Sequence, residues 1–66
     1  MKNRIKVLRA ERNLTQQQLA DLAGISRTTL AMIEKEKAVP DGTTIALLVK
    51  ALGVSADQIF FELSVV

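Results

Sequence analysis

Apolar residues recur at three- and four-residue spacing in two short runs between residues 15 and 36, and Gly24 separates the runs. This spacing is that of one face of a helix, so it predicts a helix over 16–23 and a second over 27–35. The residues expected to face inward are Leu19, Leu22, Ala23, Leu30 and Ile33. Ala20 is small, and we expect the two helices to approach each other closely there.

Polar residues at the ends of both runs support this prediction. Thr15 precedes the first helix, and Gln18 three residues later completes a capping box. Ser26 is the expected cap of the second helix. Gly24 can adopt the left-handed conformation in which many helices end. Because the connection is too short for a long helical hairpin, the two runs predict a helix-turn-helix.

Three more helices are expected around this pair. The first covers residues 4–12 with Ile5 and Leu8 facing inward, and Asn13 tolerates the left-handed conformation after it. A strongly apolar helix starts at Thr43 or Thr44 and ends at residue 53, at the centre of the core or in an interface. Its inward residues are Ile45, Leu48, Val49 and Leu52. A second capping box at 55–58 predicts a short fifth helix to about residue 60.

The C-terminal residues 61–66 alternate apolar and polar side chains, which is typical of a strand. A lone strand needs a partner, and we expect an antiparallel pair with the first few residues of the chain. Phe61, Leu63 and Val65 would line one face and are the candidate dimer interface. A frayed tail is the alternative.

Composition narrows the possible functions. The 66 residues suffice for one domain and include no cysteine or histidine. Disulfides and thiolate metal sites are therefore excluded, and the commonest general base and nitrogen ligand are missing, so we expect no cofactor and no enzyme. No apolar run is long enough for a membrane span, and a cytoplasmic location is the default expectation. Nine basic against seven acidic side chains is a mild excess, so the net charge alone does not indicate a nucleic-acid partner, and the positions of the charges have to be considered.

The outward face of the helix over 27–35 carries the candidate recognition residues. Its N-terminal end has a guanidinium group, hydroxyls and the positive end of the helix dipole, and a protruding helix fits the DNA major groove. The candidates for base-edge contacts are Arg27, Thr28 and Met32. Arg27 can pair with guanine or bind a phosphate. Met32 can pack on thymine methyl groups, or it is partly buried against a neighbouring helix.

Candidate phosphate contacts surround this face. They are Gln16, Gln17, Thr29, Lys35 and Lys37. At Gln16, open backbone N–H groups and a side-chain amide form a phosphate clamp, unless Gln16 is only an exposed polar residue. Glu36 and Asp41 oppose the two lysines, so we expect modest, salt-dependent phosphate affinity.

The segments 15–20, 24–27, 33–35 and 51–55 resemble the Cro and phage-repressor type of helix-turn-helix, the xenobiotic-response-element family. The resemblance extends from Ile5 to Phe60. It implies an all-α, compact five-helix bundle of the lambda-repressor type, with a short terminal strand pair as an expected addition. It also implies an ion pair between Arg9 and Glu34, largely structural, that joins the first helix to the recognition helix.

The chain departs from the family pattern at Glu36, where a glycine with positive φ is usual. A glutamate there either bears strain, or the helix ends differently.

These observations predict a single helix-turn-helix domain over 1–66, with the helix-turn-helix at 16–35 and a tail at 61–66. We expect a transcriptional regulator, a repressor, that binds double-stranded DNA as a homodimer at a palindromic operator. No membrane and no small-molecule ligand are expected as partners. The alternative is an antitoxin-like module whose apolar fourth helix and tail bind a partner protein.

Overall fold

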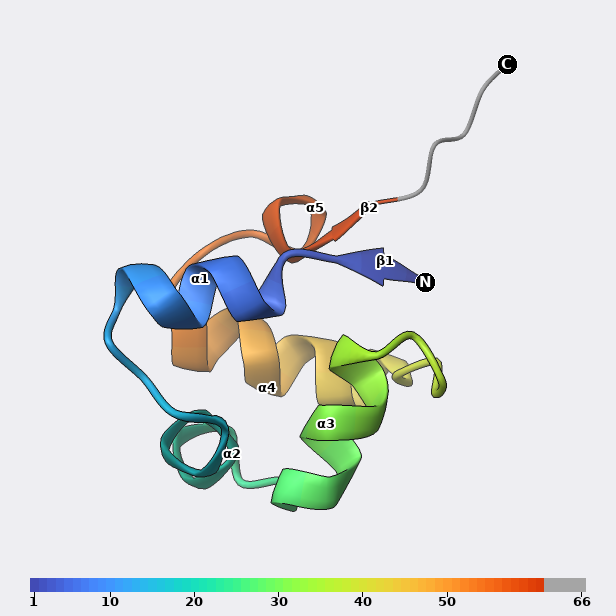
Figure 1. Ribbon diagram of the computed structural model, residues 1–66. Coiled ribbons are helices and arrows are strands. Elements are labelled where there is room, and N and C mark those ends of the chain that lie inside the picture. Colours follow the sequence, from blue (N-terminus) through green and yellow to red (C-terminus); the bar gives the residue numbers. More distant parts are fainter. Residues whose placement is uncertain (62–66) are drawn as a thin grey trace.

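The computed structural model describes residues 1–61, which form five helices and one pair of short strands (Figure 1). In chain order these elements are β1 (Lys2–Asn3), α1 (Ile5–Glu11), α2 (Gln16–Ala23), α3 (Arg27–Glu34), α4 (Gly42–Leu52), α5 (Ala56–Ile59) and β2 (Phe60–Phe61). The predicted helical fold with a central helix-turn-helix and a terminal strand pair is confirmed.

The core lies where the helices meet around α4, which Figure 1 shows between α1 and α2, with α3 at one side. All five helices contribute buried apolar side chains, among them Ile5, Leu19, Leu30, Leu48 and Ile59. Removal of this apolar surface from water is the main favourable contribution to folding. In α4, Leu48 and Leu52 are buried, and Ile45 and Val49 pack against the core from partly buried positions. The inward face expected for α4 is therefore used within the protein itself.

The prediction for Leu22 is wrong. This residue was expected to face inward, but 62% of its surface is exposed. The buried residues of α2 are Leu19, Ala20 and Ala23, and at about 100° per residue Leu22 lies roughly 110° from the centre of that face. Because the small Ala20 turns towards the core, Leu22 turns out of it and lines a shallow surface hollow with Leu14, Gln18 and Asp21.

The start of α4 was also mispredicted. The helix begins at Gly42 rather than at Thr43 or Thr44, and Asp41 is its cap. The Asp41 carboxylate accepts a hydrogen bond from the Thr44 backbone N–H at 2.8 Å, and this bond lowers the pKa of Asp41 below its ordinary value. Asp41, Thr43 and Thr44 are all residue types that can cap a helix, so the sequence pattern alone did not select Asp41.

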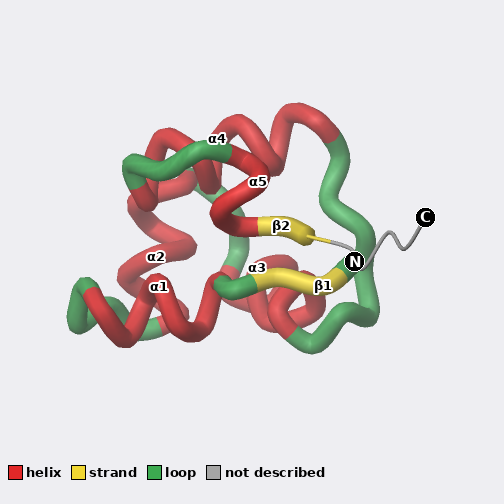
Figure 2. The backbone as a smooth tube through the Cα atoms, turned by 90° about the horizontal axis from the view of Figure 1, so that it is seen from above, coloured by secondary structure: helices red, strands yellow, loops and turns green. Residues whose placement is uncertain are grey.

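The two strands join the ends of the described chain in an antiparallel pair, with Lys2 opposite Phe61 and Asn3 opposite Phe60 (Figure 2). This confirms the predicted antiparallel pairing of the two ends, although the second strand starts at Phe60 rather than at Phe61. Leu63 and Val65 of the candidate interface lie outside the described residues. Phe61 is 37% exposed, and the Arg4 guanidinium carbon lies 5.1 Å from the centre of its ring. None of the helices within residues 1–61 has the length and apolar character needed to cross a membrane.

Candidate nucleic-acid interface

The face of α3 that was predicted to be outward is on the surface. Leu30 and Ile33 are buried on the opposite side, which fixes the rotation of the helix. The exposed residues of the outward face are Arg27, Thr28, Met32 and Lys35, while Ala31 is partly buried. Met32 is 39% exposed, so a large part of its side chain is open on this face.

The first turn of α3 is held by a local cap. The Ser26 hydroxyl oxygen accepts a hydrogen bond from the Thr29 backbone N–H at 3.0 Å, and the Ser26 hydroxyl donates to Thr29 Oγ1 at 2.8 Å. The Thr29 hydroxyl proton therefore remains able to donate to a phosphate oxygen. Arg27 and Thr28, beside this cap, are exposed.

The start of α2 lies close to the last turn of α3. Thr15 caps α2 as predicted: its hydroxyl accepts from the Gln18 N–H at 3.0 Å, and the Gln18 side chain accepts from the Thr15 N–H at 2.8 Å. The N–H groups of Gln16 and Gln17 precede the first intrahelical bonds, so they are available to a phosphate at the open end of the helix.

The two glutamine side chains at this helix start differ in their contacts. Gln16 is partly buried, and its Nε2 donates to Glu34 Oε1 at 3.1 Å. Gln17 is exposed, and its Nε2 donates to Asp21 Oδ1 at 2.8 Å along the same helix. The amide of Gln16 is therefore fixed by another element, whereas the amide of Gln17 is held only by its own helix.

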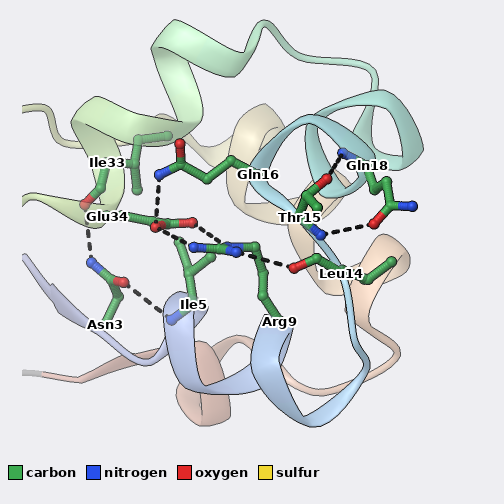
Figure 3. Close-up of polar contacts among 9 residues, drawn as sticks. All are labelled: Asn3, Ile5, Arg9, Leu14, Thr15, Gln16, Gln18, Ile33 and Glu34. Carbon is green, nitrogen blue, oxygen red and sulfur yellow. Dashed lines mark hydrogen bonds and ion pairs between the residues drawn. The ribbon is translucent and has the colours of Figure 1, made fainter.

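The Arg9–Glu34 ion pair implied by the family resemblance is present (Figure 3). Arg9 Nε donates to Glu34 Oε2 at 2.8 Å, and Arg9 Nη2 donates to Glu34 Oε1 at 3.1 Å. The side chains are 14% and 7% exposed, respectively. Arg9 Nη1 also donates to the Leu14 carbonyl oxygen at 3.0 Å, so the guanidinium joins α1, the entry to α2 and the end of α3.

Asn3 makes two side-chain contacts that were not predicted from the sequence. Its Nδ2 donates to the Ile33 carbonyl oxygen at 3.0 Å, and its Oδ1 accepts from the Ile5 N–H at 3.1 Å (Figure 3). One amide therefore links β1, the start of α1 and the end of α3. Nothing in the local sequence distinguishes this asparagine from one in an extended lead-in.

The segment after α3 carries the remaining phosphate candidates. Lys35 and Lys37 are exposed, and the acidic side chains of Glu36 and Asp41 that were expected to oppose them are exposed as well. Neither lysine forms an ion pair with another residue of the range 1–61. Glu36 has a φ of 61°, so α3 does end in the left-handed conformation and the glutamate bears the strain.

Comparison with known proteins places this geometry in a family. A family model described as Helix-turn-helix matches residues 5–59. The immunity repressor protein of Bacillus phage phi105 is 44% identical over 59 residues, which cover 89% of this chain and 41% of that protein. The chain thus spans about two fifths of that repressor. The uncharacterized HTH-type transcriptional regulator MJ0272 of Methanocaldococcus jannaschii is 43% identical over 60 residues, which cover 91% of each chain.

A solved structure shares the fold. The crystal structure of the restriction-modification controller protein C.AhdI from Aeromonas hydrophila superposes with a TM-score of 0.81 at 28% sequence identity, and the match covers 86% of each chain. The match of the family model extends from the first residue of α1 to the last residue of α5. The chain therefore belongs to the helix-turn-helix family, of the Cro and phage-repressor type that its motifs resemble.

Proposed function

We propose that this protein is a sequence-specific DNA-binding transcriptional regulator that represses by occupying promoter DNA. The observation that carries the proposal is the exposed face of α3, whose opposite face is locked into the core by Leu30 and Ile33. A helix held in this way can enter the major groove without rearrangement of the fold. The names of the phage immunity repressor and of MJ0272 support a role in transcription.

Sequence reading is assigned to the first turns of α3. Arg27 pairs with the O6 and N7 acceptors of guanine, and Thr28 contacts a neighbouring base edge through its hydroxyl or methyl group. Met32, one turn further on, packs against thymine methyl groups. A bidentate arginine–guanine pair contributes about 1–3 kcal/mol of discrimination against a wrong base.

Phosphate binding is assigned to residues that border this reading face. They are Gln16, Gln17, Thr29, Lys35 and Lys37. These contacts position α3 and carry no sequence information themselves. Each lysine that neutralises a phosphate releases counterions, and it steepens the dependence of log K on log salt by about 0.9.

We further propose that two copies act together as a homodimer. One recognition helix spans only a few base pairs, so a second copy related by a two-fold axis adds the specificity that one lacks. The operator is then palindromic, with half-site centres about 34 Å apart. The proposed contact surface is the terminal strand pair, with Phe61 and the tail residues Leu63 and Val65.

Selection of bound sequences from a random double-stranded DNA pool at two salt concentrations tests this function. The expected result is a palindromic motif with half-sites one helical turn apart, bound more weakly at the higher salt concentration. A pool that enriches no motif would contradict sequence-specific binding.

Light scattering on the full chain and on a chain without residues 63–66 tests the dimer. The truncation is expected to raise the dimer dissociation constant. If the truncated chain remains dimeric at low concentration, the interface lies elsewhere.

A further inference from the structure

We infer that Glu34 is a positioning residue for DNA binding: together with Arg9 it holds the Gln16 amide and the start of α2 in the geometry that receives a phosphate. The inference rests on the proposed function and adds a role to an ion pair that the family resemblance describes as structural. Glu34 itself is the last residue of α3, and its carboxylate accepts a hydrogen bond from Gln16, the phosphate candidate.

The geometry gives two attachments from one carboxylate to the start of α2 (Figure 3). The direct one is the hydrogen bond from Gln16 Nε2 to Glu34 Oε1 at 3.1 Å. The indirect one runs through Arg9, which binds both oxygens of Glu34 and donates from Nη1 to the Leu14 carbonyl oxygen at 3.0 Å. Residues 14 and 16 lie on either side of the cap Thr15, so the helix start is held at both sides.

The charges also suit this role. A carboxylate near a phosphate site would repel the DNA, but Glu34 is paired with a guanidinium along both of its oxygens. The Glu34 side chain is only 7% exposed, and Gln16 is partly buried above it. One N–H of the Gln16 amide is directed to Glu34, which leaves the second N–H for a phosphate oxygen.

The expected benefit for DNA binding is that the Gln16 side chain is preorganised. A long polar side chain that is already ordered before binding does not lose its rotamer freedom on binding. Ordering of one such side chain changes affinity by about 2- to 10-fold. Gln17, whose amide bonds to Asp21 on its own helix, receives no such support from Glu34.

A double-mutant cycle tests the inference. The double variant Arg9→Met/Glu34→Leu replaces the ion pair by apolar side chains of similar length, an exchange that is often neutral for folding. We expect this folded variant to bind the selected operator about 2- to 10-fold more weakly than wild type. Gln16→Ala should weaken binding in the wild-type background but have no further effect in the double variant. Gln17→Ala is the matched control, and its effect should be the same in both backgrounds.

Two further measurements separate positioning from folding. NMR relaxation of the Gln16 side-chain amide in the DNA-free protein should show an ordered group in wild type and a disordered one in the double variant. Glu34→Gln retains an oxygen acceptor for Gln16 while it removes the charge. In that background Gln16→Ala should still weaken binding, and this test is available even where the apolar pair does not fold.

The outcomes distinguish this inference from the proposed function. Equal effects of Gln16→Ala in wild type and in the double variant would overturn the positioning role alone. A mobile Gln16 amide in the wild-type protein would overturn it too, and so would a Glu34→Gln background in which Gln16→Ala has no effect. If the wild-type protein binds no DNA, the proposed function fails and the inference fails with it.

Discussion

The two ends of α3 differ in how they are held. At the N-terminal end Arg27 and Thr28 are exposed, and the local Ser26–Thr29 cap holds the turn. At the C-terminal end Glu34 is bound by Arg9 and Gln16, and the Ile33 carbonyl accepts from Asn3. The side-chain hydrogen bonds at the first end join residues three apart in sequence, whereas those at the second end come from α1, α2 and β1.

Because the two ends are held differently, they are expected to contribute differently to the stability of the protein and to the recognition of DNA. Because side chains from α1, α2 and β1 hold the last turn, the exposed side chains of the first turn can be changed at little cost to the stability of the fold. Substitutions at the anchored end should therefore act mainly on stability and, through the Gln16 amide, on the affinity for DNA, whereas those at the open end should act on sequence recognition. The predictions below test this separation.

The largest effect is expected for Glu34→Ala. It leaves the Arg9 guanidinium, whose side chain is 14% exposed, without its partner, and removal of one member of a buried pair costs about 3 kcal/mol. Urea unfolding followed by circular dichroism measures the loss. Glu11→Ala is the control, because it removes a surface ion pair: the Glu11 side chain is 63% exposed, and its Oε1 lies 3.6 Å from Arg12 Nη1. Glu11→Ala should lower the free energy of unfolding by less than about 0.5 kcal/mol. Equal losses for both variants would contradict a stabilising role of the Arg9–Glu34 pair.

At the open end, Arg27→Ala should leave stability within about 0.5 kcal/mol of wild type, because Arg27 is exposed. Its preference for the selected operator over random DNA should fall by about 1–3 kcal/mol. Competition binding with the two DNAs at one salt concentration measures this preference. An equal loss on both DNAs would make Arg27 a phosphate contact instead.

Glu36→Gly should stabilise the protein by about 0.5–1 kcal/mol. A left-handed residue other than glycine costs about 1–2 kcal/mol, and the greater flexibility of glycine in the unfolded chain offsets part of the gain. Gly24→Ala is the mirror control. Gly24 has a φ of 74° and nothing lies within 4 Å of an added Cβ, so the expected loss comes from the backbone alone. A thermal melt of each variant decides the sign, and destabilisation by Glu36→Gly would show that this side chain makes a contact of its own.

The smallest effect on stability is expected at Asp41, the N-cap residue of α4. The hydrogen bond from Thr44 lowers the pKa of Asp41 in the folded state, so its contribution to stability is present above about pH 4 and is lost as the pH falls further. Asp41→Asn keeps a good cap but no longer titrates. Between pH 7 and pH 3 the variant should lose less stability than wild type in urea unfolding. Equal losses would assign the acid sensitivity to other carboxylates.

Local features of this protein could be predicted well. Thr15, Gln18 and Ser26 were expected to cap α2 and α3, and each does so. Gly24 and Asn13 were expected in left-handed positions, with φ values of 74° and 55° in the structure. These features depend on residues within one helical turn of each other, so the sequence contains the whole interaction.

Distant contacts could not be predicted in this way. Asn3 and Ile33 are 30 residues apart, and Gln16 and Glu34 are 18 residues apart. No pattern in the sequence indicated either contact, and the Arg9–Glu34 pair was expected only through the family resemblance. The face assigned to Leu22 was wrong for a related reason, since helical spacing gives a stripe but not its rotation against the neighbouring helices.

The amino-acid sequence by itself determined the presence of the helices, the caps of α2 and α3 and the exposed set on α3, because a backbone hydrogen bond or a helical face requires only near neighbours. Only the tertiary structure decided which apolar residue of α2 is left outside and which amide meets Glu34. Both depend on how closely helices pack, and that depends on the volumes and contacts of side chains from all the elements together.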